Sequence, residues 1–337
     1  MKFFYLKIPI IIALLVVTSC KKNSPNSTTE KAKNIIKEIK LKYAPDRRTA
    51  RFNASVTKKG KQLIIKGITT NKDALTDFKK QIDSSNIDIV DSLVLLPTED
   101  LKGKTGIINN SVSNIRSTKG DASEMATQAL LGTPVKILQK KGGWYMVQTP
   151  DKYIGWIYQS EMAIKDSSDY NNWLSKPKLI FTEMYGKSYA SIDRKQPVSD
   201  LIAGDILALN GEDATFYYVE YPDGRAAFVD KEQTQPYNSW LASLQPTQQT
   251  LIETSKQFLG LPYLWGGTSP KGVDCSGFTK SVYFLNGMII PRDASQQVNT
   301  GKLIDDKKDF SNLQPGDLLF FGRITPEGKE KVVHVGM

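Results

Sequence analysis

One stretch, residues 259–284, constrains the fold more than any other, and it reads LGLPYLWGGTSPKGVDCSGFTKSVYF. Apolar residues recur at helical spacing through its second half and just beyond it, at Phe278, Val282 and Leu285. Asp274 suits the N-cap of this helix, and Asn286-Gly287 suits its C-terminal end. Cys275 is therefore expected in the first helical turn, where the helix dipole favours the thiolate, the nucleophilic form of cysteine.

The chain has one histidine, His334, in the segment KVVHVGM. The alternation of this segment predicts a strand with His334 on the face opposite Val333 and Val335. A cysteine at a helix start and a histidine on a later strand form the arrangement of cysteine peptidases, in which the imidazole takes the thiol proton. A buried cysteine and an unrelated solvated histidine are the alternative, because free cysteine is usually a core residue.

The blocks YLWGG, DCSGF, IPRDASQQ, LQPGDLLFF and HVG occur in this order between Gln245 and Met337. Together they resemble the NlpC-type family of papain-fold cell-wall peptidases. The resemblance implies an α+β fold, a cysteine nucleophile and no cofactor. It also implies hydrolysis of peptide bonds in peptidoglycan, commonly between D-glutamate and a diamino acid.

The first residues, MKFFYLKIPIIIALLVVTSC, have a basic start and a short apolar core. This pattern predicts a secretion signal over residues 1–19, and VTSC resembles a lipobox that ends in Cys20. An ordinary cleavage site that happens to end in cysteine is the alternative. We therefore expect an exported chain, lipid-anchored through Cys20 at the periplasmic face or in the cell envelope.

The chain contains two cysteines, so lipidation of Cys20 would leave Cys275 as the one free thiol. An exported protein that retains an unpaired thiol favours a catalytic role for it. The formal charge is +10. An exported protein does not meet nucleic acid, so the anionic wall or membrane surface is the expected neighbour, with solubility alone as the alternative.

Polar residues 20–30 predict a tether. Residues 31–100 then predict a small α+β module: a helix from Lys31 to Lys42, a hairpin over 51–67, a second helix over 73–82 and a strand over 87–96. No chemistry is evident in this module.

Residues 101–165 contain short strands separated by Gly, Pro and Asp turns, which is typical of a small barrel. Its blocks resemble a bacterial SH3-like domain. Residues 166–240 repeat the pattern, since LALNGEDATFYYVEYPDGRAAFV parallels VKILQKKGGWYMVQTPDKYIGWI. Residues 239–249 are interpreted as a linker, a short helix is expected over 250–259, and residues 245–337 form the peptidase domain.

The family's triad ends in a third polar residue on the strand after the histidine, and this sequence stops three residues after His334. The peptidase domain is therefore expected to be C-terminally truncated and weakly active, and a longer chain to be active. The resemblance also implies substrate contacts: Asp274 and Ser276 for the free amine of L-Ala, Tyr263 and Trp265 as an aromatic wall, and Ser295. Glu124 and Tyr158 of the first SH3-like domain are expected to close the site from outside. Asp274 is alternatively only an N-cap.

Other chemistries lack their motifs. The sequence has no HExxH, GxxxxGK[ST], GxGxxG or GxSxG, and one histidine with one free cysteine cannot form a zinc site. Two alternatives stay open. One is a wall-binding lipoprotein without activity; the other is an enzyme on the same fold that transfers the acyl group to an amine instead of water.

Overall fold

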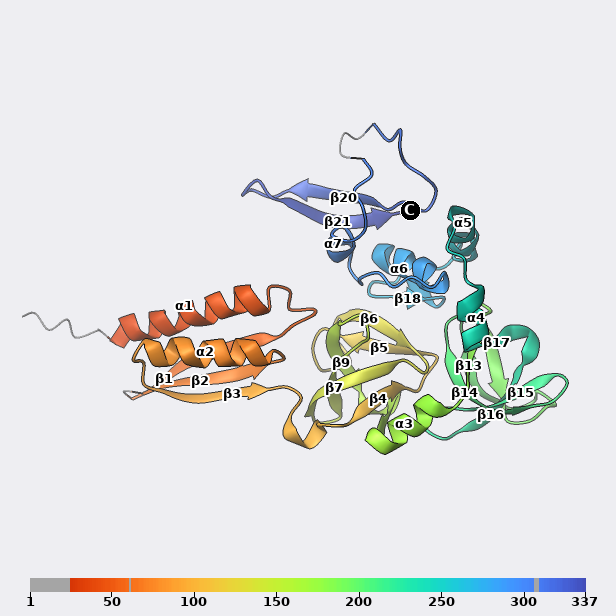
Figure 1. Ribbon diagram of the computed structural model, residues 1–337, viewed down its shortest axis with the longest axis horizontal. Coiled ribbons are helices and arrows are strands. Elements are labelled where there is room, and N and C mark those ends of the chain that lie inside the picture. The colour runs from red at the N-terminus through yellow and green to blue at the C-terminus, as the bar shows by residue number, and fades with distance from the viewer. Residues whose placement is uncertain (1–24, 61, 306–308) are drawn as a thin grey trace, which may run out of the picture.

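The computed structural model describes residues 25–60, 62–305 and 309–337, and its elements form the mixed α+β fold that the sequence predicts. The N-terminal module comprises α1 (Pro25–Tyr43), β1 (Phe52–Lys59), β2 (Gln62–Thr69), α2 (Lys72–Ser84) and β3 (Ile89–Leu95). β1 and β2 form the predicted hairpin, and α2 connects β2 to the parallel strand β3. Both helices cover one face of the sheet (Figure 1).

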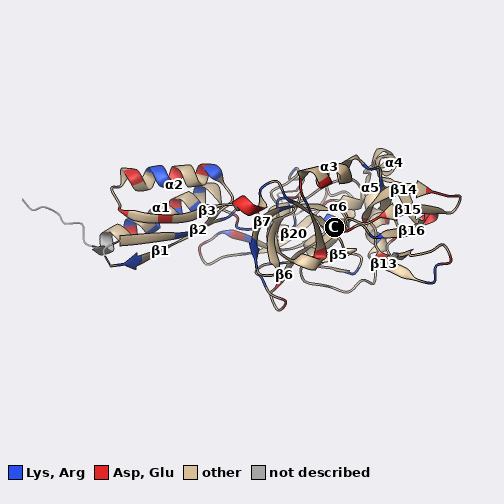
Figure 2. Ribbon diagram, turned by 90° about the horizontal axis from the view of Figure 1, so that it is seen from below, with Lys and Arg blue, Asp and Glu red and all other residues tan. Residues whose placement is uncertain are grey.

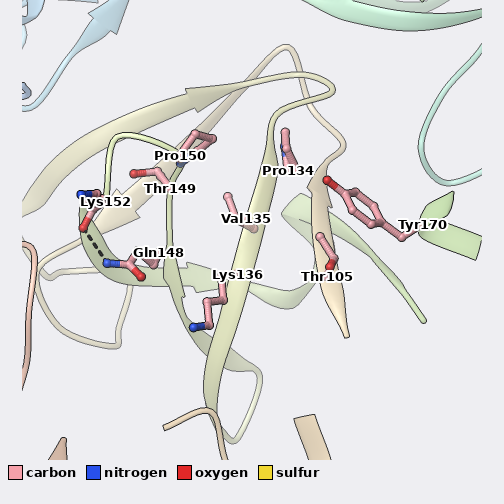
Figure 3. Close-up of a pocket in the computed structure, with 9 residues that line it drawn as sticks. All are labelled: Thr105, Pro134, Val135, Lys136, Gln148, Thr149, Pro150, Lys152 and Tyr170. Carbon is pink, nitrogen blue, oxygen red and sulfur yellow. Dashed lines mark hydrogen bonds between the residues drawn. The ribbon is translucent and has the colours of Figure 1, made fainter. Parts of the chain in front are cut away.

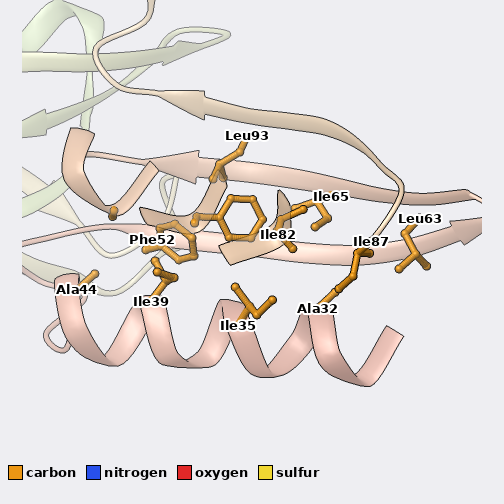
Figure 4. Close-up of a cluster of buried hydrophobic side chains, with 12 residues drawn as sticks. Ala32, Ile35, Ile39, Ala44, Phe52, Leu63, Ile65, Ile82, Ile87 and Leu93 are labelled. Carbon is orange, nitrogen blue, oxygen red and sulfur yellow. The ribbon is translucent and has the colours of Figure 1, made fainter. Parts of the chain in front are cut away.

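The core of this module lies between the helices and the sheet (Figure 4). Ile35 and Ile39 of α1 and Phe78 of α2 pack against Phe52 and Ile65, as the apolar spacing predicts. The tether prediction is wrong for residues 25–30, because α1 begins at Pro25. Proline is compatible with a first helical turn, and an ion pair between Glu30 and Lys33 at 2.7 Å supports the turn that follows.

The first barrel is a seven-stranded antiparallel sheet of order β10-β4-β7-β8-β9-β5-β6. Its strands are β4 (Thr105–Ile108), β5 (Val112–Arg116), β6 (Met125–Leu130), β7 (Pro134–Lys141), β8 (Trp144–Gln148), β9 (Ile154–Tyr158) and β10 (Met162–Lys165). The inward residues of successive strands form its core, among them Ile108, Ile115, Ile137, Val147 and Ile157. β6 is an edge strand and is therefore free to face another part of the molecule.

The second barrel follows α3 (Ser167–Ser175) and has the order β13-β12-β16-β15-β14-β11-β17. Its strands are β11 (Lys178–Phe181), β12 (Gly186–Tyr189), β13 (Pro197–Leu201), β14 (Ile206–Glu212), β15 (Phe216–Glu220), β16 (Ala226–Asp230) and β17 (Thr234–Pro236). When the second sheet is read from its other edge, beginning at β17, its strands follow the same order as those of the first barrel. Short 3₁₀ turns precede the first barrel, at η1 (Glu99–Leu101), and the last strand of each barrel, at η2 (Gln159–Glu161) and η3 (Lys231–Gln233).

The segment interpreted as a linker is partly helical. α4 (Tyr237–Ser243) packs against β11 and β17, and the rings of Tyr237 and Trp240 lie 5.9 Å apart. These aromatic contacts stabilise a helix that the Ser, Gln and Pro content of the stretch concealed. α5 (Gln248–Gln257) buries Leu251 as expected, but it ends before Leu259, whose side chain is exposed.

The C-terminal region contains β18 (Thr268–Ser269), β19 (Gly272–Val273), α6 (Cys275–Leu285), α7 (Ala294–Gln297), β20 (Leu319–Ile324) and β21 (Glu330–Gly336). Leu251, Phe258 and Val282 form its buried core, so the predicted apolar face of α6 does point inward. β18 lies against both α6 and β6 (Figure 1). The first barrel therefore meets this region at its free edge strand.

Positive and negative residues are interspersed along the helices and sheets, as Figure 2 shows. None of the helices within the described residues is long and apolar enough to cross a membrane. The predicted signal and Cys20 lie outside those residues.

Candidate functional site

Cys275 is the first residue of α6, and its side chain is partly exposed. Asp274 caps the helix, since its Oδ1 accepts a hydrogen bond from the backbone N–H of Gly277 at 2.7 Å. Both positions are as predicted. The thiol thus lies at the positive end of the dipole of an 11-residue helix.

Arg292 forms a buried ion pair with Asp274 directly behind the thiol. Its Nη2 lies 2.7 Å from Asp274 Oδ2 and its Nη1 3.1 Å from Oδ1. Burial alone would lower the pKa of Arg292, but the hydrogen bonds and charge of Asp274 raise it above its usual value. The Arg292 guanidinium therefore stays charged, and its two hydrogen bonds to Asp274 fix the start of α6.

These contacts bear on the predicted amine-binding role of Asp274. Its carboxylate also accepts from the backbone N–H of Gly266 at 2.9 Å and from the Ser276 hydroxyl at 3.3 Å. That hydroxyl is buried and in turn accepts from Arg292 at 2.9 Å. An incoming ammonium would meet a carboxylate that Arg292 already neutralises, so these contacts favour the supporting role. Substrate contact by Asp274 and Ser276 stays a prediction.

His334 lies on β21, the predicted strand, which packs against α6 and α7. It pairs with Phe321 of β20, whose ring centroid is 5.7 Å from its own, and its side chain is exposed. A β-bulge interrupts the pairing at Val333, which is 56% exposed. The expectation that Val333 and Val335 share one face, opposite His334, is therefore wrong, because the bulge breaks the alternation beside the histidine.

Three of the predicted contacts are exposed: the aromatic residues Tyr263 and Trp265 and the acid Glu124. The indole Nε1 of Trp265 donates to Glu124 Oε1 at 2.9 Å, so the first barrel and the C-terminal region meet here as expected. Burial and the charge of the Cys275 thiolate raise the pKa of Tyr263, so Tyr263 lies within electrostatic reach of the thiol.

The other predicted contacts have different neighbours. Tyr158 ends β9 and packs edge-to-face on Trp144, with ring centroids 5.4 Å apart, which is a contact within the barrel. Ser295 is exposed on α7 and accepts a hydrogen bond from Arg48 of the N-terminal module at 3.0 Å. The roles of both residues at the site stay predictions.

Comparison with known proteins agrees with this geometry. The profile of the NlpC/P60 family matches residues 260–337, and that of the bacterial dipeptidyl-peptidase Sh3 domain matches residues 115–161. A γ-D-glutamyl-L-lysine dipeptidyl-peptidase of Bacillus subtilis is 32% identical over 221 residues, which cover 63% of this chain and 68% of that protein. The chain belongs to the NlpC/P60 family.

Two further similarities support the assignment to NlpC/P60. A γ-D-glutamyl-L-lysine dipeptidyl-peptidase of Bacillus cereus is 35% identical over 225 residues, 64% of this chain and 65% of that protein. The crystal structure of an NlpC/P60 family protein from Bacillus cereus superposes with a TM-score of 0.58 and 30% identity, covering 68% of this chain and 86% of that one.

The first barrel forms a wall of the NlpC/P60 domain through its edge strand β6. Thr127 Oγ1 accepts from Arg292 Nε at 3.1 Å, and Gln128 Oε1 accepts from the backbone of Thr268 at 2.9 Å. Lys280 of α6 pairs with Asp151 at 2.8 Å. Burial works to raise the pKa of Asp151, but the charge and hydrogen bond of Lys280 hold it below its ordinary value. These contacts attach the catalytic helix to the barrel.

Two residues that support the start of α6 were not predicted from the sequence. Arg292 is one; the other is Gln297, fully buried, which donates to the Ser276 carbonyl at 3.0 Å and accepts from Thr279 at 2.9 Å. Both belong to the IPRDASQQ block, whose polar residues beside an apolar run were the available signal.

Figure 3 shows a cavity of about 350 Å³ on the first barrel, lined by Thr105, Val135, Lys136, Thr149 and Tyr170 among others. None of the predicted site residues lines it, so it is separate from the thiol. No three His, Cys, Asp or Glu side chains gather at metal-binding distance in the part of the chain that the structure describes.

Proposed function

We propose that this chain is a cysteine peptidase that hydrolyses the γ-D-glutamyl–diamino acid bond of wall peptides with a free N-terminal L-Ala. The partly exposed thiol at the start of α6, which packs against the strand of His334, is the observation that carries the proposal. The names of the Bacillus relatives supply the substrate class.

His334 takes the proton of Cys275, and the thiolate attacks the γ-carbonyl carbon. The N–H groups at the start of α6 stabilise the negative charge on the carbonyl oxygen. The tetrahedral intermediate collapses to a thioester as the imidazolium gives its proton to the departing amine. Water then attacks the thioester with His334 as base, which releases the γ-carboxylate and restores the thiol.

Glu124 is the best candidate for binding the substrate's ammonium group. One of its oxygens accepts from Trp265, and the side chain is exposed at the rim, whereas Asp274 is buried and paired with Arg292. A free carboxylate gains more from an ammonium than a neutralised one does. This assignment makes the first barrel the source of specificity for an unblocked N-terminus.

The test is cleavage of L-Ala-γ-D-Glu-L-Lys, with the meso-diaminopimelate analogue and the N-acetylated peptide in parallel. We expect release of L-Ala-D-Glu from both free peptides, poor cleavage of the acetylated one, and a loss of about 10⁴-fold or more in Cys275→Ala and His334→Ala. Undiminished cleavage by Cys275→Ala would refute the mechanism. If neither the unaltered chain nor the full gene product cleaves the peptides, and both bind wall material, the binding-module alternative replaces ours. A transfer product formed with an added amine would identify acyl transfer.

We also propose that the protein is extracytoplasmic and anchored by a lipid on Cys20. The sequence VTSC and the names of wall-acting relatives support this. Cys20→Ser should move the protein from the membrane fraction to the soluble fraction. An unchanged fractionation would contradict the anchor.

A further inference from the structure

The loop of residues 44–51, between α1 and β1, connects the N-terminal module to the catalytic region. We infer that Arg48 in this loop is a positioning residue: it fixes α7 and Ser295, and so sets the affinity of the site for its peptide. The inference rests on the proposed function and extends it to a module outside the two matched domain profiles.

Arg48 uses its guanidinium to join two segments. Nε and Nη2 bind the carboxylate of Asp46, at 2.8 and 2.7 Å, while Nη1 donates to Asp293 Oδ2 at 2.9 Å and to Ser295 Oγ at 3.0 Å. Burial raises the pKa of Asp46, but the hydrogen bonds of Arg48 outweigh it and lower that pKa to about 2. The ion pair between Arg48 and Asp46 is therefore intact at any pH at which the enzyme would work.

Asp46 provides a second connection to α7. Its Oδ2 accepts from Gln296 Nε2 at 2.8 Å, and Gln296 Oε1 accepts from the backbone N–H of Asp293 at 3.2 Å, closing the capping box of α7. Two residues of the N-terminal loop thus bind three of the four residues 293–296. A helix of one turn has little stability of its own, so its orientation depends on such contacts.

The next residue of α7 reaches the catalytic helix. Gln297 donates to the carbonyl oxygens of Ser276, at 3.0 Å, and Pro291, at 2.9 Å. α7 also packs against β21, the strand of His334. A continuous series of hydrogen bonds therefore runs from Arg48 through α7 to the residue beside Cys275.

The loop itself does not depend on the Arg48 side chain. The backbone carbonyl of Arg48 accepts from Ile154 N at 2.6 Å, Thr49 O accepts from Gln148 at 3.1 Å, and Arg51 donates to Ile154 O at 3.2 Å. These bonds to the first barrel remain when the side chain is removed. An Arg48 variant should therefore fold, and its effect should be confined to α7.

The experiment compares Arg48→Ala, Arg48→Lys and Arg47→Ala in the full chain. Arg47 is the matched control, because it is exposed and makes no hydrogen bond or ion pair within the described residues. Steady-state cleavage of L-Ala-γ-D-Glu-L-Lys gives kcat and KM. The pH profile of Cys275 alkylation reports the thiol, and hydrogen exchange of residues 293–298 reports α7.

We expect Arg48→Ala to raise KM about tenfold while kcat stays within about twofold. The bound peptide and its transition state should lose the same binding energy, and the thiol chemistry should be retained. Arg48→Lys should be intermediate, since an ammonium cannot make the forked contacts. Hydrogen exchange over 293–298 should rise in Arg48→Ala, and the alkylation profile should not move. Arg47→Ala should match the unaltered chain throughout.

The inference fails if Arg48→Ala matches Arg47→Ala in KM and in hydrogen exchange. It also fails if kcat falls while KM is unchanged, because Arg48 would then act on the chemistry. If the unaltered chain shows no Cys275-dependent cleavage, the proposed function fails instead, and the exchange of residues 293–298 alone decides whether Arg48 positions α7.

Discussion

The two barrels have the same strand order, and each has a bulge in one strand pair, β5–β6 in the first and β12–β13 in the second. Within the described residues, however, only the first barrel donates or accepts hydrogen bonds with Trp265 and Arg292 of the C-terminal region. In the first barrel, the loop between β5 and β6 places Glu124 against Trp265. In the second, the equivalent loop folds back on its own barrel, where Arg194 pairs with Asp230 and lies over the ring of Phe216. The β5–β6 loop and the contacts of edge strand β6, rather than the barrel fold, separate the two roles.

The second barrel instead holds the parts together. Asp200 pairs with Lys271, which also donates to Ser111 of the first barrel at 2.8 Å. Asp205 is fully buried and accepts from the backbone of Leu131, in the first barrel, at 3.2 Å. A duplicated fold can therefore keep a supporting role in one copy while the other copy forms the site.

The largest effect should come from breaking the ion pair that the first barrel supports. Arg292→Met keeps an apolar side chain of similar length but leaves Asp274 buried and unpaired, which typically costs about 3–5 kcal/mol of unfolding free energy. Urea unfolding measures this loss. The double variant with Arg292→Met and Asp274→Asn should recover part of the lost unfolding free energy. Arg194→Ala, in the second barrel, should stay close to the unaltered chain; a loss as large as that of Arg292→Met would contradict the distinction between the barrels.

Two glycines with similar backbone conformations provide a second test. Gly266 (φ +81°) has the carbonyl oxygen of Met125 at 2.3 Å from where a Cβ would lie, whereas Gly224 (φ +90°), in the second barrel, has open space. Gly224→Ala should lose only the cost of a left-handed residue, about 1–2 kcal/mol. Gly266→Ala should lose about 1–3 kcal/mol more unfolding free energy, measured with urea, because the backbone of Met125 must move to make room for the new methyl group. Equal losses would show that the contact with Met125 is unimportant.

Removing one negative charge from each loop compares the β5–β6 loop of the first barrel with the β12–β13 loop of the second. Glu124→Gln keeps the acceptor for Trp265 but removes the charge, so we expect KM for the free tripeptide to rise about tenfold, or about 1.4 kcal/mol. Asp193→Asn, in the equivalent loop of the second barrel, should leave KM unchanged. The N-acetylated peptide is the control substrate. If both substrates lose equally in Glu124→Gln, Glu124 does not recognise the amine.

The smallest effect, taken per pH unit, concerns how the unfolding free energy depends on Asp205 of the second barrel. Burial raises the pKa of Asp205 well above its usual 3.8 and outweighs the two backbone N–H groups that it accepts from. The folded chain then binds a proton more tightly than the unfolded chain. Its stabilisation is complete below the unfolded pKa and is lost as pH rises towards the folded pKa, by at most about 1.4 kcal/mol per pH unit. Asp205→Asn should flatten this decline in urea unfolding measured from pH 4 upwards. An unaltered slope would contradict the assignment.

Local signals in the sequence predicted the local parts of the site. The helix of Cys275, its cap at Asp274 and the strand of His334 follow from periodicity and cap chemistry, which act within a few residues. Arg292 was missed because its partners lie 18 and 165 residues away in sequence. The bulge at Val333 was missed because it depends on the pairing with β20. Helix α4 was missed because its aromatic contacts stabilise a helix that the amino-acid composition of the segment does not favour.

The contacts of Arg292 also bear on how the protein is made. Thr127 precedes Arg292 by 165 residues, and a chain that is synthesised from its N-terminus folds its early domains first. The first barrel can therefore fold before Cys275 is synthesised, and α6 then assembles on an existing surface. A fragment that begins after the barrels would carry Arg292 without Thr127 and Gly266 without Met125. Its nucleophile would be synthesised without the surface that orients it.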